Sequence, residues 1–293
     1  MNNILLYVIA VLIWGSTWLV IKLHVGPAPV EISILYRSVV ALVALWLWCG
    51  VKGISLKASK RDHVFLFALG IAMFSAHHIF IYAASKHVVS GIVAVVFSTV
   101  SLFNVFHNYI FFKVKPTLNV VVGVVMGILG ICVFFYDDIA ALTFQDHTIK
   151  GLVLTSISAF IFSFSSMITK RNQAQRLEDI ACMTIGMTYG VGLLMVYVLA
   201  LDFHFALPST SLYWSAVVYL GVFGSVLAPL CYLKMIKNFG AEQASYAILL
   251  FPIVALVLSS IFEDYQWSVG DFVGLALVTT GGLLVRKKKE IVR

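Results

Sequence analysis

Two stretches of the chain, GIAMFSAHHIFIYAASKHV from Gly70 to Val88 and GVFGSVLAPLCYLKMIKNF from Gly221 to Phe239, align without gaps at an offset of 151 residues. The same offset continues into the later part of each copy, where it pairs Lys86 with Lys237, Ile110-Phe111 with Ile261-Phe262, Gly123 with Gly274, and Gly130 with Gly281. Near the start of each copy the offset is 148, and it pairs Trp14 with Phe162 and Lys22 with Lys170. This shared register indicates that the chain contains two copies of one structural unit.

The composition places both copies in a membrane. Of the 293 residues, 61% are hydrophobic and only 11% are charged, whereas soluble domains carry about 25% charged residues. The apolar residues occur in runs of about 20, which cross a ~30 Å hydrocarbon layer at ~1.5 Å per residue. We therefore expect an all-α polytopic membrane protein.

Charged residues and breaks that contain proline or glycine divide the chain into ten candidate transmembrane helices. Their expected limits are 3–23, 30–50, 64–84, 88–112, 118–136, 150–170, 180–200, 212–233, 240–262 and 269–286. Each copy holds five helices, and an odd number inverts the second copy in the membrane. The expected fold is thus two inverted five-helix repeats, an arrangement typical of secondary transporters that bind substrate at mid-membrane between the halves.

This fold sets the expected domain limits. Residues 1–293 form a single membrane domain, with the first repeat at 1–136 and the second at 150–286. Residues 137–149 are expected to be a periplasmic linker, and residues 287–293 a basic cytoplasmic tail.

The distribution of charge gives the expected orientation. The net charge is +7, and most lysines and arginines fall in alternate loops and in the C-terminal tail. This asymmetry is the positive-inside pattern of a multi-pass protein in the cytoplasmic (inner) membrane with both termini cytoplasmic. The orientation of the protein in the lipid bilayer thus explains its net positive charge, and there is no reason to expect a nucleic-acid partner.

Several longer motifs resemble the drug/metabolite transporter superfamily, specifically its EamA-type ten-helix transporters. They are IWGSTW from Ile13, PVEISILYRSVVAL from Pro29, FGAEQASYAILLFPIVAL from Phe239, and the paired endings KVKPTLNVVVGVVMGILGICV from Lys113 and EDYQWSVGDFVGLALVTTGGLLV from Glu263. The resemblance implies transport of small metabolites, commonly amino acids or related solutes, and often export. Two positions depart from the family pattern: Ser101 replaces a proline in the fourth helix, and Phe112-Lys113 replaces the acidic residue at its end.

The first helix carries the clearest candidate for a binding surface. Trp14 lies about eleven residues into the helix, or ~16 Å, too deep for an interfacial tryptophan. Trp14, Thr17 and Trp18 share one helix face, and the repeat places Phe162 at the position that corresponds to Trp14. We interpret these residues as part of a cavity wall, with core packing as the alternative for Trp14.

Polar side chains also recur at helical spacing in three other expected helices. The stripes are Ser75, His78, Tyr82 and Ser85; Ser101, Asn104 and Asn108; and Ser158, Phe162, Ser165 or Ser166, and Thr169. Such stripes indicate either a shared aqueous cavity or hydrogen bonds between helices. We expect a site between helices 1, 3, 4, 6, 8 and 9, with these substrate-binding candidates: Trp14, Thr17, Trp18, His78, Tyr82, Ser101, Asn104, Phe162, Ser166 and Tyr246.

Arg37 lies about 10 Å below the outer boundary of the second helix. Its side chain points toward the N-terminal end of that helix, so we expect Arg37 to snorkel to the outer face or to form an ion pair at a gate. The alternative is that its guanidinium binds a substrate carboxylate in bidentate fashion.

Other chemistries lack the residues that they need. His77 and His78 point about 100° apart on a helix, so we expect no metal site there and treat His77 as packing. The sequence has no hydrolase motif and no phosphate-binding loop, so we expect neither catalytic residues nor a cofactor. The alternatives to a transporter of amino acids are a passive channel, a non-transporting scaffold, or a transporter of nucleosides, adenosyl metabolites or nucleotide sugars.

Small residues recur at four-residue spacing in the fifth and tenth helices, as Gly123 with Gly127 and Gly270 with Gly274. Such pairs let helices approach closely. We expect that contact to lie either within the fold or in a homodimer formed through these two helices.

Overall fold

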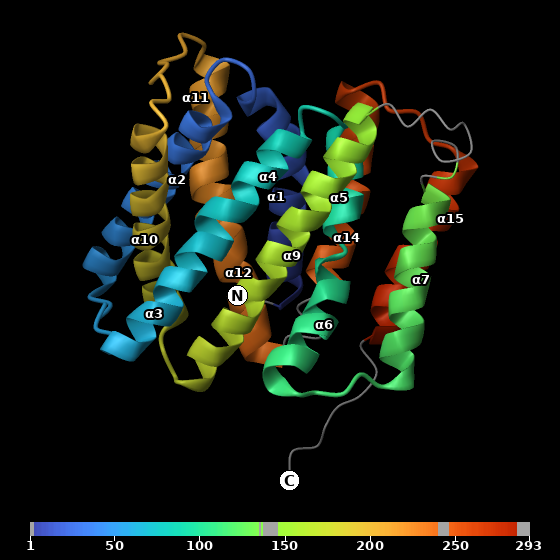
Figure 1. Cartoon of the computed structure of the whole chain (residues 1–293), viewed down its shortest axis with the longest axis horizontal. Helices are drawn as coiled ribbons and strands as arrows, with labels where there is room; N and C mark the ends of the chain where they lie inside the picture. The colour runs from blue at the N-terminus through green and yellow to red at the C-terminus, as the bar shows by residue number, and fades with distance from the viewer. Residues whose placement is uncertain (1–2, 135, 137–145, 240–245, 286–293) are drawn as a thin grey trace.

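The computed structural model describes residues 3–134, 136, 146–239 and 246–285. All regular secondary structure in these residues is helical. Seven helical spans are long and apolar enough to cross a membrane, and three shorter apolar helices bring the total to the expected ten. The protein is therefore a multi-pass helical bundle (Figure 1).

The first repeat contains five spans. They are α1 (Asn3–His24), α2 (Val30–Lys52), a third span of α3 (Lys60–Leu69), η1 (Gly70–Ala76) and α4 (His77–Ala84), a fourth span of α5 (Ser90–Phe97) and α6 (Val100–Phe112), and α7 (Leu118–Phe134). Each begins and ends within a few residues of the expected limits.

The second repeat follows the same plan. Its spans are α9 (Asp146–Ala174), α10 (Asp179–Ala200), an eighth span of α11 (Ser211–Val218), η2 (Tyr219–Leu227) and α12 (Ala228–Phe239), then α14 (Tyr246–Phe262) and α15 (Val269–Val285). Helix α9 begins at Asp146, so the last part of the expected 137–149 linker is helical. Residues 137–145, 240–245 and the expected tail at 287–293 lie outside the described residues.

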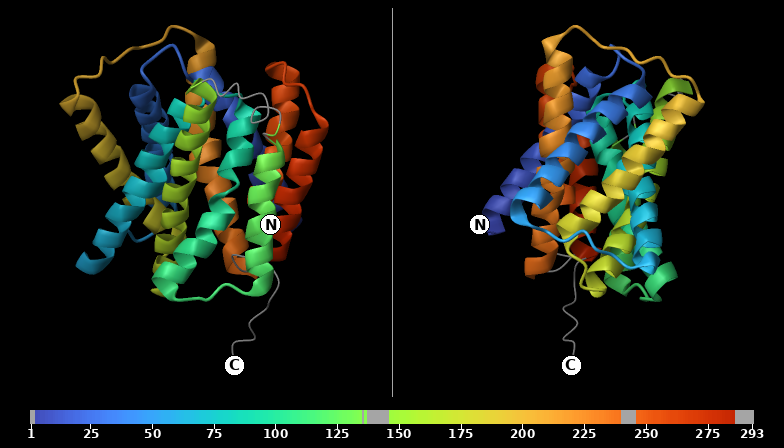
Figure 2. Two further views of the ribbon diagram at one scale, coloured as in Figure 1. Left: turned by 45° about the vertical axis from the view of Figure 1, so that its right-hand side comes forward. Right: turned by 90° about the vertical axis from the view of Figure 1, so that its left-hand side faces the viewer.

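The described connections between spans gather at two ends of the bundle. Figure 1 shows the α1–α2, α4–α5, α10–α11 and α14–α15 connections at what we call the upper end. The α2–α3, α6–α7 and α9–α10 connections lie at the lower end, and the further views in Figure 2 agree. This alternation is the one that ten antiparallel spans require.

The two π-helices, η1 and η2, lie at corresponding places in the two repeats. In each, a serine hydroxyl donates to the carbonyl five residues earlier: Ser75 Oγ to Gly70 O at 3.2 Å, and Ser225 Oγ to Leu220 O at 2.9 Å. Short π-segments inside α-helices are rare and are frequent at functional sites. Their matching positions are what duplication of one half predicts.

Each π-helix packs closely on a helix of the other repeat. Gly70 of η1 lies against the backbone of Gly186 and Gly190 in α10. A Cβ atom on Gly221 of η2 would lie only 2.9 Å from the Arg37 carbonyl oxygen in α2. Glycine is thus required at both contacts, and the two repeats are packed together at backbone distance.

The glycines of α7 and α15 face one another within one chain. A Cβ atom on Gly130 would lie 2.7 Å from Gly274 O, and one on Gly281 would lie 2.5 Å from Gly123 O. The two helices lie side by side at one edge of the bundle (Figure 1). Of the two expected contacts, the structure thus shows the one within the fold; the glycine faces are covered and unavailable to a second copy.

The fourth span bends without the proline that the family pattern would place there. The helix is interrupted between α5 and α6, where Ser98, Thr99 and Ser101 each donate a side-chain hydrogen bond to a carbonyl three residues earlier. Such bonds compete with the helical backbone bonds and bend helices. The interruption lies directly after Phe97, which lines the central cavity described below.

Candidate functional site

A central cavity of about 90 Å³ lies between the two repeats. The first repeat contributes spans 1, 3 and 4 and also α2 to its wall, and the second repeat contributes spans 6, 8 and 9. Pockets that hold drug-sized ligands are typically ~300–1,000 Å³. In this conformation the cavity therefore suits a small solute.

Six tryptophan and phenylalanine side chains line the cavity: Trp14, Trp18, Phe74, Phe97, Phe162 and Phe251. The ring centroids of Trp18 and Phe97 lie 5.1 Å apart, those of Trp18 and Phe251 5.6 Å, and those of Phe97 and Phe162 5.4 Å. These are normal distances for interacting aromatic pairs. Four of these rings, Trp18, Phe97, Phe162 and Phe251, thus form one connected aromatic cluster to which both repeats contribute.

Arg37 reaches this cavity from α2 instead of extending to the surface. Its side chain lines the cavity, and the residue is only 4% exposed. The expectation that Arg37 snorkels is wrong, and Arg37 forms no ion pair with a carboxylate in the described part of the chain. The cause is η2, which packs against α2 at backbone distance and offers acceptors that the sequence of α2 alone does not reveal.

Three neutral oxygens hold the guanidinium of Arg37. Nitrogen NH1 donates to Tyr82 Oη at 3.1 Å, and NH2 donates to Ser225 Oγ at 2.8 Å and Leu220 O at 3.3 Å. Leu220 and Ser225 both belong to η2. The π-segment thereby positions the charge at the cavity wall.

Tyr82, expected to bind substrate, lies behind Arg37 instead of in the cavity wall. Its hydroxyl accepts from Arg37 and lies 3.0 Å from His24 Nδ1, so Tyr82 can donate its own proton to that ring nitrogen. Tyr82 is fully buried. Its contacts fit a residue that orients Arg37.

The polar stripe of the third span divides between two environments. His78 lines the cavity, whereas Ser75 donates to Gly190 O at 2.9 Å and Ser85 donates to Tyr82 O at 2.9 Å. His77, which we treated as packing, also lines the cavity, and its ring lies 5.2 Å from that of Phe162. The wider turn of η1 changes the direction of the residues that follow it, which a regular 100° spacing does not anticipate.

The polar residues of the fourth and sixth spans bond to one another or to backbone carbonyls: Ser101, Ser165 and Thr169 each donate to a carbonyl of their own span. Ser163 Oγ donates to Asn104 Oδ1 at 2.8 Å and lies 2.9 Å from His107 Nδ1. Neither Asn104, Ser101 nor Ser166 lines the cavity. For Asn104, the structure therefore shows the alternative interpretation of the stripes, a hydrogen bond between helices. The side chain of the remaining candidate, Tyr246, lies outside the described residues.

The other candidates, Trp14, Thr17, Trp18 and Phe162, all line the cavity. Sequence reasoning missed Phe97, Phe251 and His77, and it named Arg37 as a residue of the cavity only in its alternative; the repeat offset relates neither phenylalanine to a recognised site residue. No group of three or more histidine, cysteine, aspartate or glutamate side chains suited to a metal occurs in the described residues.

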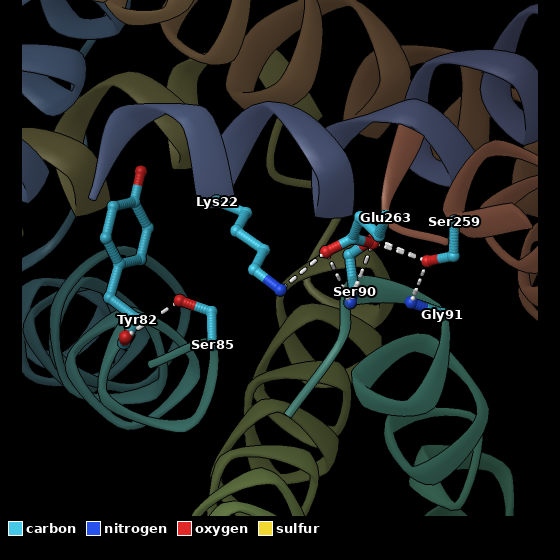
Figure 3. Close-up of polar contacts among 7 residues, drawn as sticks. All are labelled: Lys22, Tyr82, Ser85, Ser90, Gly91, Ser259 and Glu263. Carbon is cyan, nitrogen blue, oxygen red and sulfur yellow. Dashed lines mark hydrogen bonds and ion pairs between the residues drawn. The ribbon is translucent and has the colours of Figure 1, made fainter. Parts of the chain in front are cut away.

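A polar cluster ties three helices together at the upper end (Figure 3). Lys22 Nζ of α1 lies 2.7 Å from Glu263 Oε1, just after α14. Glu263 Oε2 accepts from Ser259 Oγ at 2.5 Å and from the Ser90 hydroxyl and, at 3.1 Å, the Ser90 backbone N–H at the start of α5. We call Lys22, Ser90, Ser259 and Glu263 the upper cluster. Burial by itself raises the pKa of Glu263, but the hydrogen bonds from Lys22, Ser259 and Ser90 outweigh it and hold that pKa below its usual value.

The related positions of the other repeat meet at the lower end. Lys170, which corresponds to Lys22, donates from Nζ to Asn108 Oδ1 at 2.9 Å and lies 4.4 Å from the centre of the Phe112 ring. Asn108 and Phe112 correspond to Ser259 and Glu263 at the offset of 151. We call Lys170, Asn108 and Phe112 the lower cluster, in which a neutral amide and an aromatic ring replace the carboxylate.

A family model described as the EamA-like transporter family matches residues 1–136 and 149–286, which is nearly the whole chain in two copies. The chain belongs to the EamA-like transporter family. The resemblance predicted from the sequence motifs is therefore confirmed, as is the fold of ten helices in two repeated halves.

Relatives of this EamA-like transporter share its whole length. An uncharacterized transporter from Archaeoglobus fulgidus is 23% identical over 99% of this chain and 100% of its own. The uncharacterized inner membrane transporter YedA from Escherichia coli is 26% identical over 96% of this chain and 89% of its own. A solved crystal structure superposes with a TM-score of 0.71 over 98% of this chain and 99% of its own, at 17% identity, which supports the fold alone.

These findings assign the general activity. The EamA-like transporter is a multi-pass membrane protein of a transporter family and not an enzyme. The names of these relatives specify no substrate.

Proposed function

We propose that this EamA-like transporter is a secondary transporter that exports a small metabolite, an amino acid or a related solute, by alternating access. The observation that carries the proposal is the central aromatic cavity, whose wall comes from both repeats. Two similar halves can pack in two near-equivalent ways, each open to one side of the membrane. A cavity between them is where a solute would be exposed to each side in turn.

The charge distribution supports an orientation for this cycle. Basic residues gather at the lower end, in the described connections and in the helix ends beside them: Lys52, Lys57, Lys60, Arg61, Lys113, Lys115, Arg171 and Arg176. By the positive-inside rule the lower end faces the cytoplasm, in the inner membrane, and both termini lie on that side. The upper cluster then lies on the periplasmic side of the cavity.

Counterflow in proteoliposomes tests the proposal. The purified protein is expected to exchange an unlabelled solute for a labelled one with saturable kinetics, in a panel of amino acids, nucleosides, adenosyl metabolites and phosphorylated sugars. Trp14→Ala removes an aromatic surface of the cavity and is expected to lower the rate while the protein still melts cooperatively. Trp48→Ala, at an exposed position of α2, is the matched control and should retain the wild-type rate.

Three results would contradict the proposal. Flux that rises linearly with concentration and shows unitary currents would identify a passive channel. No exchange of any solute would favour a scaffold. Saturable exchange confined to nucleosides, adenosyl metabolites or phosphorylated sugars would reject amino acids as the substrate class.

A further inference from the structure

Arg37 places an unpaired positive charge inside the membrane-spanning part of the protein. Among the described residues that line the cavity, Arg37 is the only lysine, arginine, aspartate or glutamate. A guanidinium group is not deprotonated in proteins, so it keeps its positive charge. A buried charge is costly without a counter-charge, and ionisable groups inside membranes usually mark substrate or ion pathways.

The contacts of Arg37 orient this charge without neutralising it. Tyr82 Oη, Ser225 Oγ and Leu220 O are all uncharged acceptors. Tyr82 is itself held by His24, and Gly224 leaves room beside the guanidinium, since a Cβ atom there would lie 3.7 Å from NH2. The charged group is therefore fixed in place before any ligand binds.

Three nitrogens of the cavity wall have no hydrogen-bond partner among the described residues; one is Nδ1 of His78, and the other two always carry a hydrogen. These two are Nε of Arg37 and Nε1 of Trp18, in side chains of residues that are 4% and 7% exposed. Buried donors in native proteins are nearly always paired with protein, water or a ligand. Both belong to residues that line the same cavity, so one oxyanion placed there can pair with both and supply the counter-charge.

We propose that Arg37 binds the single carboxylate of the transported solute and that the Trp18 indole N–H donates to the same group. Because Nη2 already donates to Ser225 Oγ and Leu220 O, the carboxylate pairs with the unpaired Nε–H of Arg37 through a charge-assisted hydrogen bond, and the Trp18 N–H supplies the second bond that fixes its orientation. The rest of the solute then lies on the aromatic wall, where an ammonium group can interact with ring faces. With one cation in the described wall, the cavity suits a monocarboxylate, including a zwitterionic amino acid, better than a neutral solute or a polyanion.

This assignment rests on the proposed function for its biological meaning, but binding can test it without transport. The experiment measures quenching of tryptophan fluorescence in the purified full-length protein by pairs of ligands, each an amino acid or small aromatic monocarboxylate and its amide. The acid is expected to bind at least about tenfold more tightly than its amide, as a charge-assisted pair predicts. Because Trp14 and Trp18 lie in the cavity wall, occupancy should change the fluorescence.

Variants separate an anchoring role from a structural one. Arg37→Gln is expected to reduce the preference for acid over amide to less than about twofold, because the charge that recognises the carboxylate is lost. Arg37→Lys keeps the charge without the planar fork, so it should retain part of the preference and provides a second variant if Arg37→Gln fails to fold. Arg171→Gln removes the same charge outside the cavity, where Arg171 pairs with Asp62 at 2.6 Å, and should leave the preference unchanged.

The outcomes distinguish this assignment from the proposed function. Acids that bind in preference to amides without counterflow would support the anchor and contradict transport of those acids. Counterflow with equal binding of acids and amides, or a full preference in Arg37→Gln, would overturn the anchor and leave transport standing. A panel in which no acid binds better than its amide, or in which phosphate monoesters bind best, would also overturn it.

Discussion

The upper and lower clusters occupy corresponding positions of the two repeats but differ in chemistry. At the upper end, Lys22 pairs with Glu263, which Ser90 and Ser259 also bind. At the lower end, Lys170 donates a hydrogen bond to Asn108 and contacts the ring of Phe112. The side chain of Glu263 is 7% exposed, so water weakens the upper ion pair less than it would weaken a surface pair.

This difference shows how a duplicated fold becomes asymmetric through very few residues. Hydrogen bonds to charged groups stabilise by roughly 1.5–3 kcal/mol, whereas neutral ones contribute about 0.5–1.5 kcal/mol. The upper cluster therefore holds α1 to α14 more firmly than the lower cluster holds α9 to α6. An equilibrium between one conformation open at the upper end and another open at the lower end would respond to such a difference, since ~1.4 kcal/mol changes the ratio of two populations about tenfold.

The strongest test removes the carboxylate of the upper cluster. Glu263→Ala is expected to lower the free energy of unfolding by about 2 kcal/mol, because Ser90 and Ser259 lose their acceptor while the half-exposed Lys22 can turn to water. Thermal unfolding in detergent measures the change. Asp264→Asn, at the adjacent exposed carboxylate, is the control and should melt like the wild type; equal losses in both variants would remove the distinction between the two ends.

Acidic pH tests the same carboxylate with a smaller expected effect, because protonation removes the charge but leaves neutral hydrogen bonds. The pKa of Glu263 is lower in the folded protein than its usual value of about 4.3. The stability that it contributes is therefore fully present above that usual value and is lost as the pH falls through the folded pKa. Unfolding of wild type and Glu263→Gln should differ most at neutral pH and converge in acid; a constant difference across this range would contradict the prediction.

The smallest expected effect comes from adding a carboxylate to the lower cluster. Phe112→Glu should form an ion pair with Lys170 and stabilise the protein by about 0.5 kcal/mol relative to Phe112→Gln, since both partners are accessible to solvent. Salt should remove most of this gain by screening, while the more buried upper pair is affected less. Melting at low and high salt measures both effects, and a gain that persists in high salt would show that charge is not its origin.

The sequence predicts the fold well because the membrane leaves few alternatives. Every backbone polar group inside a bilayer must be paired within the protein, so apolar runs of about 20 residues become helices. The repeat offset then relates the halves, and it correctly places the aromatic residues Trp14 and Phe162 at one cavity.

The site is less predictable because it depends on contacts between helices. Arg37 enters the cavity since η2 presents Leu220 O and Ser225 Oγ to it, and nothing in the sequence of α2 indicates those acceptors. Asn104, whose spacing alone is equally consistent with a cavity, instead accepts a hydrogen bond from Ser163 of a neighbouring helix. Helical spacing also fails at His77, which we treated as packing: His77 and His78 both line the cavity, so its wall covers more than one face of this helix.

The glycine contacts of the two π-helices have a consequence for motion. Where side chains meet, the ridges of one helix fit the grooves of another, and any rotation must first separate them. At Gly70 against α10 and at Gly221 against α2, the glycine backbone lies against the neighbouring backbone, with the side chains of Tyr189 and Val40 beside it. Because the glycines add no side chain of their own, few atoms have to separate when the third or eighth span tilts at these two points, which makes each point a natural pivot.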